Sequence, residues 1–380
     1  MKVLAVTGSR SDYDLLEPVL RQIEAHPGLE LTLVVTCAHL AKAWGGTGAR
    51  IHGFSRTLLR PTLIDWDSPE ARLKSMGLEL IALAQDLAEE RPDLVLVLGD
   101  REDALLAATA ASYSWIPVAH IFGGDLGHAT VDDSVRHAVS KLAHLHFVAS
   151  EGSRDVLLRL GEDPGRIHVC GNPALDRIRR LPAWPAERLL ESFGIVPARP
   201  LILVCQHPVG PNPQAAAAEL ELILAVCRRV DAQVVVNTPN SDPGSSGPLR
   251  VWEEADQVIR VRNLEQEAWV ALLKRCNLML GNSSAGLLET PFLGIPAVNV
   301  GARQRGRSHA GNVQFVEAEA EGLQAAIHRA LDDADYRAQV RGLACPFGDG
   351  HAAERVVGDL AGLECRSLLP KRHILARSPA

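Results

Sequence analysis

The chain has 380 residues, and 39 lysines and arginines against 46 aspartates and glutamates give it a formal net charge of −7. This length suggests two domains or one large domain. The acidic excess argues against a nucleic-acid-binding protein with a basic surface. No run of about 18 apolar residues predicts a membrane-spanning helix, and the N-terminus lacks the pattern of a secretory signal.

The seven cysteines are scattered along the chain, and no pair of them has zinc-ligand spacing. An odd number of scattered cysteines is typical of a protein whose thiols stay free in a reducing compartment. We therefore expect a cytoplasmic protein without a nucleic-acid or membrane partner.

Short β-branched runs alternate with longer segments of helical period. The expected strands are residues 3–7, 31–36, 94–98, 117–121, 146–149 and 167–170, followed by 201–205, 233–236, 258–261, 278–280 and 297–300. Strands separated by helices predict βαβ units and parallel sheets. The fold class is therefore α/β, with two halves of similar size.

The domain boundary is predicted in residues 179–198, where Pro182, Pro185 and Pro197 interrupt the pattern. Residues 1–180 form the expected first domain, 199–355 the second, and 356–380 a final helix and tail. We expect residues 370–380 to fray. Two such domains predict a central ligand cleft between the carboxyl ends of their strands.

The first candidate site lies between the first strand and the first helix, at residues 7–13. Backbone amides of Gly8 and Ser9 at a helix N-terminus, with Arg10 beside them, suit an anion such as phosphate. A tight turn with an aspartate N-cap explains the same residues, and both interpretations stay open here.

The second candidate site is Gly99-Asp100-Arg101, directly after the apolar strand 94–98. An acid followed by an arginine at this sheet edge suits proton transfer and anion binding. A capping aspartate is the alternative.

The third candidate site combines residues 120–125 with residues 132–137. His120 precedes a Gly-Gly pair that lets backbone approach a ligand closely. The carboxyl groups of Asp125, Asp132 and Asp133 crowd together, and Arg136 supplies counter-charge. Crowded carboxylates raise one another's pKa, so one can act as an acid while another stays a base.

The fourth candidate site is residues 281–289, again between a strand and a helix. Ser283, Ser284 and Gly286 provide free amides and hydroxyls for a diphosphate, with help from the helix dipole. Glu289 is placed to bind two ribose hydroxyls, and Arg303 follows the next strand.

His207 ends the first strand of the second half, where a structural role and a ligand contact are equally expected. No P-loop, nucleophile elbow or spaced Cys/His set appears in the sequence, so we expect no metal.

The sequence resembles the hydrolysing UDP-N-acetylglucosamine 2-epimerase family of the sialic-acid and legionaminic-acid pathways. The likeness extends over about residues 2–357. The segments that carry it are 7–13, 35–40, 99–101, 132–141, 144–146, 281–289, 301–307 and 347–350. Such a series of matches in the same order is highly specific.

The resemblance implies a GT-B-like fold of two Rossmann-like domains that face a central cleft, with a final helix that crosses back to the first domain. It also implies a reaction in which a UDP-linked 2-acetamido sugar and water give UDP and the free 2-epimer, of the N-acetylmannosamine type. Elimination of UDP comes first, and water then adds at C1. No cofactor is implied, and a homodimer or homotetramer is expected.

The residue patterns and the resemblance together give sixteen candidate site residues. Position by position, the resemblance assigns acid or base roles to Asp100, Asp132 and Asp133, and nucleotide or sugar contacts to Arg10, His207, Asn240, Asp242, Ser283, Ser284, Glu289 and Arg303. Candidate catalytic residues are His120, Asp100, Asp125, Asp132 and Asp133. Candidate nucleotide- and sugar-binding residues are Arg10, Arg101, Arg136, His207, Asn240, Asp242, Ser283, Ser284, Gly286, Glu289 and Arg303.

Three residues depart from the family pattern. Relatives carry Glu or His where this chain has Phe122, and Glu where it has Asp125. Phe122 cannot move a proton, and Asp125 is one methylene shorter than Glu. Asp14 adds negative charge near the expected nucleotide.

These departures keep two alternatives open. One is a GT-B-type glycosyltransferase, which would need an acceptor. The other is a non-catalytic nucleotide-sugar-binding homologue.

Overall fold

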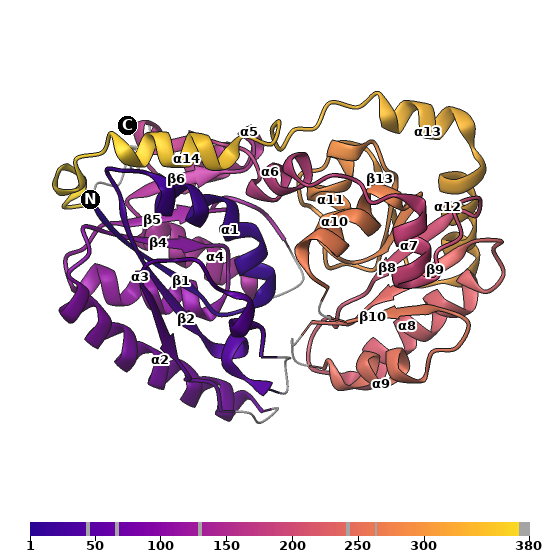
Figure 1. Ribbon diagram of the computed structural model, residues 1–380, viewed down its shortest axis with the longest axis horizontal. Helices are drawn as coiled ribbons and strands as arrows, with labels where there is room; N and C mark the ends of the chain where they lie inside the picture. The colour runs from indigo at the N-terminus through magenta and orange to yellow at the C-terminus, as the bar shows by residue number, and fades with distance from the viewer. Residues whose placement is uncertain (43–45, 65–67, 128–130, 241–243, 263, 372–380) are drawn as a thin grey trace, which may run out of the picture. The chain divides into compact units, whose positions relative to one another are not determined.

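The computed structural model describes residues 1–380 except 43–45, 65–67, 128–130, 241–243, 263 and 372–380. The chain divides into two compact units (Figure 1). Unit 1 comprises residues 1–126, 131–176 and 347–380, and unit 2 comprises 127–130 and 177–346.

Unit 1 is built on a seven-stranded parallel sheet in the order β3-β2-β1-β4-β5-β6-β7. Its strands are β1 (Lys2–Thr7), β2 (Glu30–Thr36), β3 (Thr57–Arg60), β4 (Leu94–Leu98), β5 (Val118–Ile121), β6 (Leu145–Val148) and β7 (Ile167–Val169). Because β1 pairs with β2 on one side and β4 on the other, the chain reverses its direction of winding beside β1. The turns after β1 and β4 lie at this switch point, where open α/β sheets bind ligands.

The helices of unit 1 connect and cover these strands. They are α1 (Arg10–Ala25), α2 (Pro69–Glu90), α3 (Glu102–Tyr113), α4 (Asp132–Leu142), α5 (Glu151–Arg159) and α14 (Ala352–Ala361), with 3-10 turns η1 (Cys37–Leu40), η3 (Thr47–Arg50), η4 (Pro164–Arg166) and η6 (Cys365–Leu368). Leu16, Leu20 and Ile23 on α1 are fully buried, as their spacing predicts. α6 (Pro173–Arg180) begins in unit 1 and ends in unit 2.

The last helix returns to unit 1, as the resemblance implies. α14 packs against α1. Its first amides, on Ala352 and Ala353, each donate to the carboxylate of Asp176 at 2.9 Å. This carboxylate satisfies two of the amides that a helix N-terminus leaves unpaired.

Unit 2 is built on a six-stranded parallel sheet in the order β10-β9-β8-β11-β12-β13. Its strands are β8 (Leu201–Cys205), β9 (Gln233–Asn237), β10 (Ile259–Val261), β11 (Leu278–Gly281), β12 (Ala297–Val300) and β13 (Val313–Val316). Its helices are α7 (Ala186–Phe193), α8 (Pro213–Cys227), α9 (Ser246–Glu254), α10 (Gln266–Arg275), α11 (Ala285–Leu288), α12 (Ala320–Asp332) and α13 (Ala334–Arg341), with one 3-10 turn, η5 (Thr290–Leu293).

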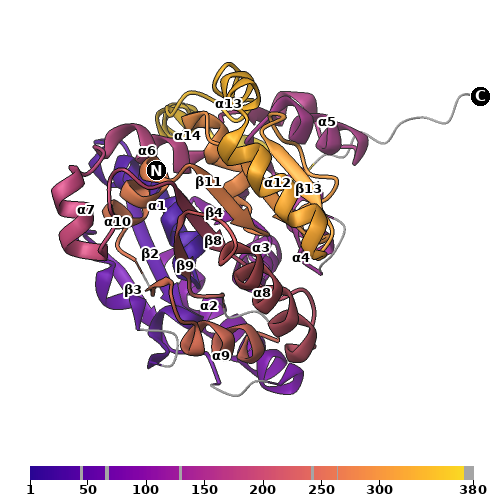
Figure 2. The same cartoon turned by 90° about the vertical axis from the view of Figure 1, so that its right-hand side faces the viewer.

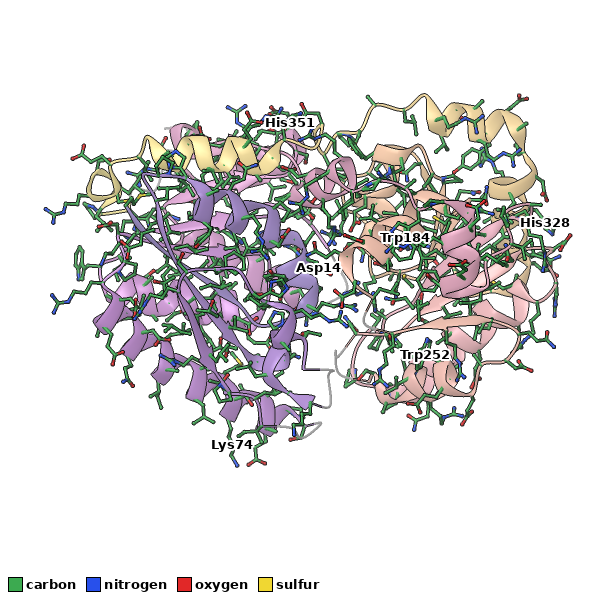
Figure 3. All side chains as sticks on the ribbon, viewed as in Figure 1. Asp14, Lys74, Trp184, Trp252, His328 and His351 are labelled. Carbon is green, nitrogen blue, oxygen red and sulfur yellow. The ribbon has the colours of Figure 1, made fainter. Side chains whose placement is uncertain are left out.

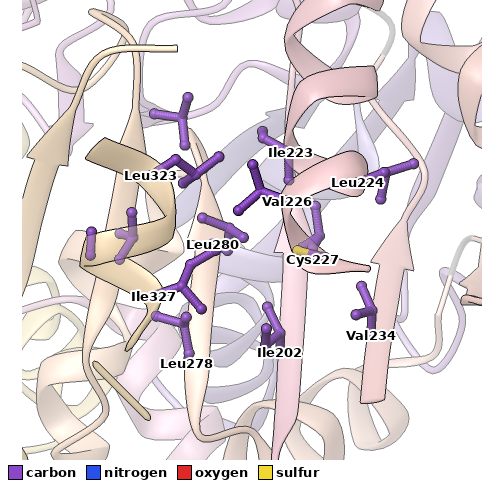
Figure 4. Packing of buried hydrophobic residues seen from close by; sticks show 14 of the residues in the cluster. Ile202, Ile223, Leu224, Val226, Cys227, Val234, Leu278, Leu280, Leu323 and Ile327 are labelled. Carbon is purple, nitrogen blue, oxygen red and sulfur yellow. The ribbon is translucent and has the colours of Figure 1, made fainter. Parts of the chain in front are cut away.

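The core of unit 2 lies between its sheet and the helices α8 and α12 (Figure 4). Ile202 and Leu280 of the sheet meet Ile223 of α8 and Leu323 and Ile327 of α12, and all five are buried. Such continuous apolar strands are typical of parallel sheets covered by helices.

Two segments are more ordered than expected. The proline-rich stretch 179–198 contains α7, which Trp184 precedes (Figure 3). The ring of Trp184 stacks on that of Phe193, the last residue of α7, with centroids 6.0 Å apart. The expectation that fraying starts at residue 370 is wrong for Lys371, whose side chain pairs with Glu162 at 2.7 Å. Residues 372–380 lie outside the described residues. Among the helices that the structure describes, none is both long and apolar enough to cross a bilayer.

Candidate functional site

Arg136 gathers the acidic residues of the second and third candidate sites. Its side chain is 6% exposed, and it forms ion pairs with Asp100 and with Asp133, the latter at 3.1 Å. It also donates to the backbone carbonyl of Asp125 at 3.1 Å. These partners follow β4, begin α4 and follow β5, so one guanidinium joins three segments. The carboxylates of Asp100 and Asp133 remain 25% and 21% exposed and can meet a ligand.

The predicted residues next to this group have clear positions. Asp132 opens α4 beside Asp133, and α4 has no side-chain N-cap bond. The N-cap of α3 is Arg101, again without a side-chain bond, so the capping interpretation of Asp100 is wrong.

His120 is fully buried behind the Asp100 turn. Its Nε2 lies 2.8 Å from the carbonyl oxygen of Gly99, and its Nδ1 lies 3.1 Å from the hydroxyl of Ser140. Because a carbonyl only accepts, Nε2 carries the proton and Nδ1 accepts from Ser140. Burial lowers the pKa of His120 to about 3. The ring is therefore a neutral support for the Gly99-Asp100 turn.

The Gly-Gly pair packs closely within the protein, and its predicted approach to a ligand stays a prediction. A Cβ on Gly124 would lie 2.1 Å from the carbonyl oxygen of Ser153. A Cβ on Gly123 would lie 2.9 Å from Ser140 Oγ and 3.0 Å from His120 Nδ1. These two glycines let the backbone after β5 pass close to Ser153 of α5 and to the side chains of Ser140 and His120.

Ser9, and not an aspartate, is the N-cap of α1. Its hydroxyl accepts from the amide of Asp12 at 3.4 Å and donates to the Asp12 carboxylate at 2.7 Å. The aspartate-cap interpretation of this turn is therefore wrong. Arg10 is the first residue of the helix, and Asp14 lies half-buried one turn later (Figure 3).

In unit 2, Asn282 connects two of the predicted binding residues, His207 and Arg303. Its side chain exchanges two 2.8 Å hydrogen bonds with the backbone of His207. Its carbonyl oxygen accepts from Arg303 at 3.2 Å and from Gln304 at 2.8 Å. The amide of Asn240 donates to His207 Nδ1 at 3.2 Å, which leaves the ring proton on Nε2. Asp242 lies outside the described residues.

The turn after β11 differs from the expected strand–helix cradle. Ser283 Oγ accepts from the amide of Ala285 at 3.4 Å, but α11 has only four residues, so its dipole is small. Gly286 is buried, and its carbonyl oxygen accepts from Thr290 at 2.7 Å. The Glu289 carboxylate lies 3.2 Å from Trp269 Nε1 and 3.7 Å from Arg177.

Comparison with known proteins identifies the family. The family model described as UDP-N-acetylglucosamine 2-epimerase matches residues 21–361. The chain belongs to the UDP-N-acetylglucosamine 2-epimerase family.

Two relatives cover most of the chain. A protein of Legionella pneumophila, named UDP-N,N'-diacetylbacillosamine 2-epimerase (hydrolyzing), is 32% identical over 93% of this chain and 94% of its own length. A UDP-N-acetylglucosamine 2-epimerase of Neisseria meningitidis is 33% identical over 87% of each.

Solved structures of the family share the fold. A crystal structure of UDP-GlcNAc 2-epimerase from Neisseria meningitidis, bound to UDP-GlcNAc, superimposes with a TM-score of 0.78 at 21% identity, over 95% of this chain and 99% of the other. One from Methanocaldococcus jannaschii, in complex with UDP-GlcNAc and UDP, gives 0.75 at 19% over 95% and 99%. The likeness confirms a GT-B-like α/β fold of two parallel sheets with alternating helices.

Phe122, which the sequence indicates as a departure from the family pattern, is buried. The residue is 6% exposed and has a φ of +66°, a left-handed conformation that is uncommon for a non-glycine residue. Its amide donates to the carbonyl of Phe147 at 3.0 Å. Phe122 therefore belongs to the packed end of β5.

Sequence reasoning missed the buried residues that hold the predicted site residues in place. Asn282 is fully buried and Gln304 is 1% exposed, yet both join the binding group of unit 2. Ser140 does the same for His120 in unit 1. Asn282 stands inside the predicted motif directly after β11, which is the one signal that pointed to it.

Proposed function

We propose that this family member is a hydrolysing 2-epimerase. It converts UDP-N-acetylglucosamine, or a closely related UDP-linked 2-acetamido sugar, and water into UDP and the free 2-epimer of the N-acetylmannosamine type. The observation that supports it most is the group around Arg136, where one buried arginine holds two partly exposed carboxylates. The relatives from Legionella and Campylobacter whose names include "hydrolyzing" support the water-consuming reaction.

The reaction needs two proton transfers at C2. A base removes the C2 proton, the C1–O bond breaks, and UDP leaves with the bonding electrons, which gives a 1,2-unsaturated sugar. Water then adds to C1 and an acid returns a proton to the other face of C2. We assign these transfers to Asp100 and to the Asp132–Asp133 pair, because a positioned carboxyl group can serve as base or acid.

Two other predicted catalytic residues have supporting roles in this proposal. His120 is neutral, and both its ring nitrogens are engaged, so it positions the Asp100 turn. Asp125 anchors Arg136 through its backbone carbonyl. Both are positioning residues.

The nucleotide is assigned to the residues around Asn282 in unit 2, and Arg10 and Arg101 of unit 1 stay candidate binding residues. Donors on the leaving diphosphate stabilise the charge that develops as the C1–O bond breaks. Arg303, Ser283 and Ser284 supply such donors, and His207 offers Nε2–H. Glu289, fixed by Trp269 and Arg177, is proposed to bind the ribose hydroxyls.

The names of the relatives support two classes of sugar. The Legionella relative is named for a diacetamido sugar and the Neisseria relative for UDP-N-acetylglucosamine, and their identities to this chain are nearly equal. We therefore propose that the sugar is N-acetylglucosamine or a 2,4-diacetamido-6-deoxy sugar. We expect the enzyme to act in the cytoplasm as a homodimer or homotetramer.

An NMR time course in D2O tests the reaction directly. Purified protein is given UDP-N-acetylglucosamine in one tube and the UDP-linked diacetamido sugar in another. We expect UDP and a free 2-epimer that carries deuterium at C2. Release only after addition of a sugar acceptor would indicate a glycosyltransferase, and UDP binding without release would indicate a non-catalytic homologue.

A variant pair assigns the chemistry within the same assay. Asp100→Asn should abolish turnover while UDP still binds. Asp155→Asn, on the exposed face of α5, is the matched control and should keep normal turnover. Near-normal turnover of Asp100→Asn would remove Asp100 from the mechanism.

A further inference from the structure

Three potential metal ligands converge inside unit 1. They are Cys37 on η1, Glu79 on α2 and Asp103 on α3, and one ligand atom from each lies within 4.8 Å of the others. Cys37 Sγ lies 3.0 Å from Glu79 Oε2. All three side chains are buried, and Glu79 is fully inaccessible to solvent.

The charge of this cluster is poorly balanced by its surroundings. Burial is the main cause that raises the pKa of all three groups, that of Glu79 to about 7. The neighbours that raise these pKa values further are themselves acids, including Glu102 and Asp12 near Asp103. Acidic groups taken out of water need either bound protons or a cation.

One oxygen of the cluster has no partner. Among the described residues, nothing forms a hydrogen bond with Glu79 Oε1, although it belongs to the carboxyl group that contacts Cys37. Buried polar atoms in proteins are nearly always paired, so this oxygen needs an explanation, and a bound ion or water supplies one. The carboxyl group that carries it faces the cluster, because its other oxygen lies 3.0 Å from Cys37 Sγ.

We propose that Cys37, Glu79 and Asp103 bind a divalent cation of the zinc class. A thiolate with two carboxylate oxygens is a ligand set that zinc accepts, and a water molecule would complete four-coordination. The Thr62 hydroxyl, 3.6 Å from Cys37 Sγ, is placed to orient the thiolate from behind. This proposal is independent of the proposed function.

The sequence did not predict this site, because its ligands are distant along the chain. Cys37 and Glu79 are separated by 42 residues and lie on different elements. Only the fold brings η1, α2 and α3 together. The expectation of no metal followed from the absence of closely spaced Cys and His, and such a search cannot find ligands of this kind.

The location suggests that the metal is structural. An ideal Cβ on Gly8 would lie 2.1 Å from Asp103 Oδ2, so the cluster lies directly under the turn that starts α1. A cation there would tie η1, α2 and α3 to one another beneath this turn. Binding should therefore raise the thermal stability of the whole chain.

The test uses metal-stripped full-length protein reconstituted with Co2+, which reports its ligands by absorption. We expect one equivalent of Co2+ to bind, with a thiolate-to-cobalt charge-transfer band, and Zn2+ to displace it. Elemental analysis after dialysis against Zn2+ should give one zinc per chain, and the midpoint of thermal unfolding should rise. Absence of stoichiometric Co2+ and Zn2+ binding would overturn the proposal and leave a proton-sharing cluster.

Variants identify the ligands. Cys37→Ser should remove the charge-transfer band while weaker Co2+ binding persists, and Glu79→Gln or Asp103→Asn should weaken Zn2+ binding at least tenfold in competition with a chelating dye. Cys276→Ser is the matched control, because Cys276 is also buried but lies in unit 2. A charge-transfer band that survives Cys37→Ser would contradict the assignment of Cys37 as a ligand. This measurement does not require the variants to be equally stable.

Discussion

At the scale of single residues, Arg136 determines how the acidic groups meet. Its planar guanidinium contacts Asp100, Asp133 and the backbone of Asp125 at once. A lysine keeps the charge but has no fork of donors, so it cannot satisfy all three partners in the same geometry.

We therefore expect Arg136→Lys to lower kcat about 100-fold, because displacements of about 1 Å are enough for such losses. The measurement is steady-state kinetics with circular dichroism to verify folding. Arg56→Lys, which alters an exposed pair with Glu90 in the same unit, should be nearly silent. Equal activity of the two variants would show that the fork of Arg136 has no catalytic importance.

His120 predicts a dependence of stability on pH. Its folded pKa of about 3 lies below the ordinary value of 6.5, so the unfolded chain binds a proton first as the pH falls. His120 therefore makes its full contribution to the free energy of unfolding above pH 6.5. This contribution is lost progressively as the pH falls from 6.5 to 3.

At pH 5 the loss from His120 amounts to about 2 kcal/mol. Urea unfolding of the wild type and of His120→Asn at pH 7.5 and pH 5 measures it. The wild type should lose more stability over this interval than the variant, whatever their difference at pH 7.5. Parallel losses in both proteins would mean that His120 titrates normally when folded.

Sequence reasoning located the exposed site residues better than the buried ones. Asp100, Asp133 and His207 follow strands or begin helices at the sheet edge, and the pattern of a parallel α/β fold shows such positions directly. Asn282, Gln304 and the Cys37 cluster depend on contacts between distant segments. No local spacing records those contacts.

At the scale of elements, most strands could be predicted because buried parallel strands are continuous apolar runs. The two that were missed, β3 and β13, are both edge strands. Their residues are mostly half-buried and include polar side chains such as Arg60 and Gln314, so the apolar pattern is weak.

Two glycines in the left-handed conformation allow the energetic cost of that backbone conformation to be measured apart from the cost of crowded packing. Gly124 and Gly194 have φ values of +77° and +71°. A Cβ on Gly194 would meet nothing within 4 Å, whereas on Gly124 it would collide with the carbonyl of Ser153 and with Leu157.

We expect Gly194→Ala to cost about 1 kcal/mol, the ordinary penalty of the left-handed conformation. Gly124→Ala should cost at least about 2 kcal/mol more, because backbone must also move. Chemical denaturation of both variants gives the difference. Similar values would show that the β5 end relaxes freely.

At the scale of the whole molecule, unit 1 is assembled from three separate stretches of chain. Its last stretch is fastened by α14 and by Lys371, whose ammonium group donates to the carbonyl of Ser140 at 2.9 Å and pairs with Glu162. Ser140 also forms a hydrogen bond with His120, so the last stretch is connected to the residue that supports the Gly99-Asp100 turn. The pairing was hidden from the sequence, where Lys371 stands in a polar tail.

Lys371→Met keeps the length of the side chain but removes its charge from a buried pair. We expect a loss of about 2 kcal/mol, since Glu162 retains Lys141 and His146 as partners. Arg366→Met, on the exposed face of η6, is the control and should change little. Calorimetry checks both, and an unchanged midpoint for Lys371→Met would mean that the last stretch is not held by this pair.

The split composition of unit 1 also sets an order of events during synthesis. Every residue of unit 2 leaves the ribosome before α14 does, because residues 177–346 precede 347–380. Domains generally fold as units while the chain is being made. Unit 2 can therefore fold while the surface of α1 that α14 will cover is still exposed. A nascent chain stalled before residue 347 would present that surface to chaperones.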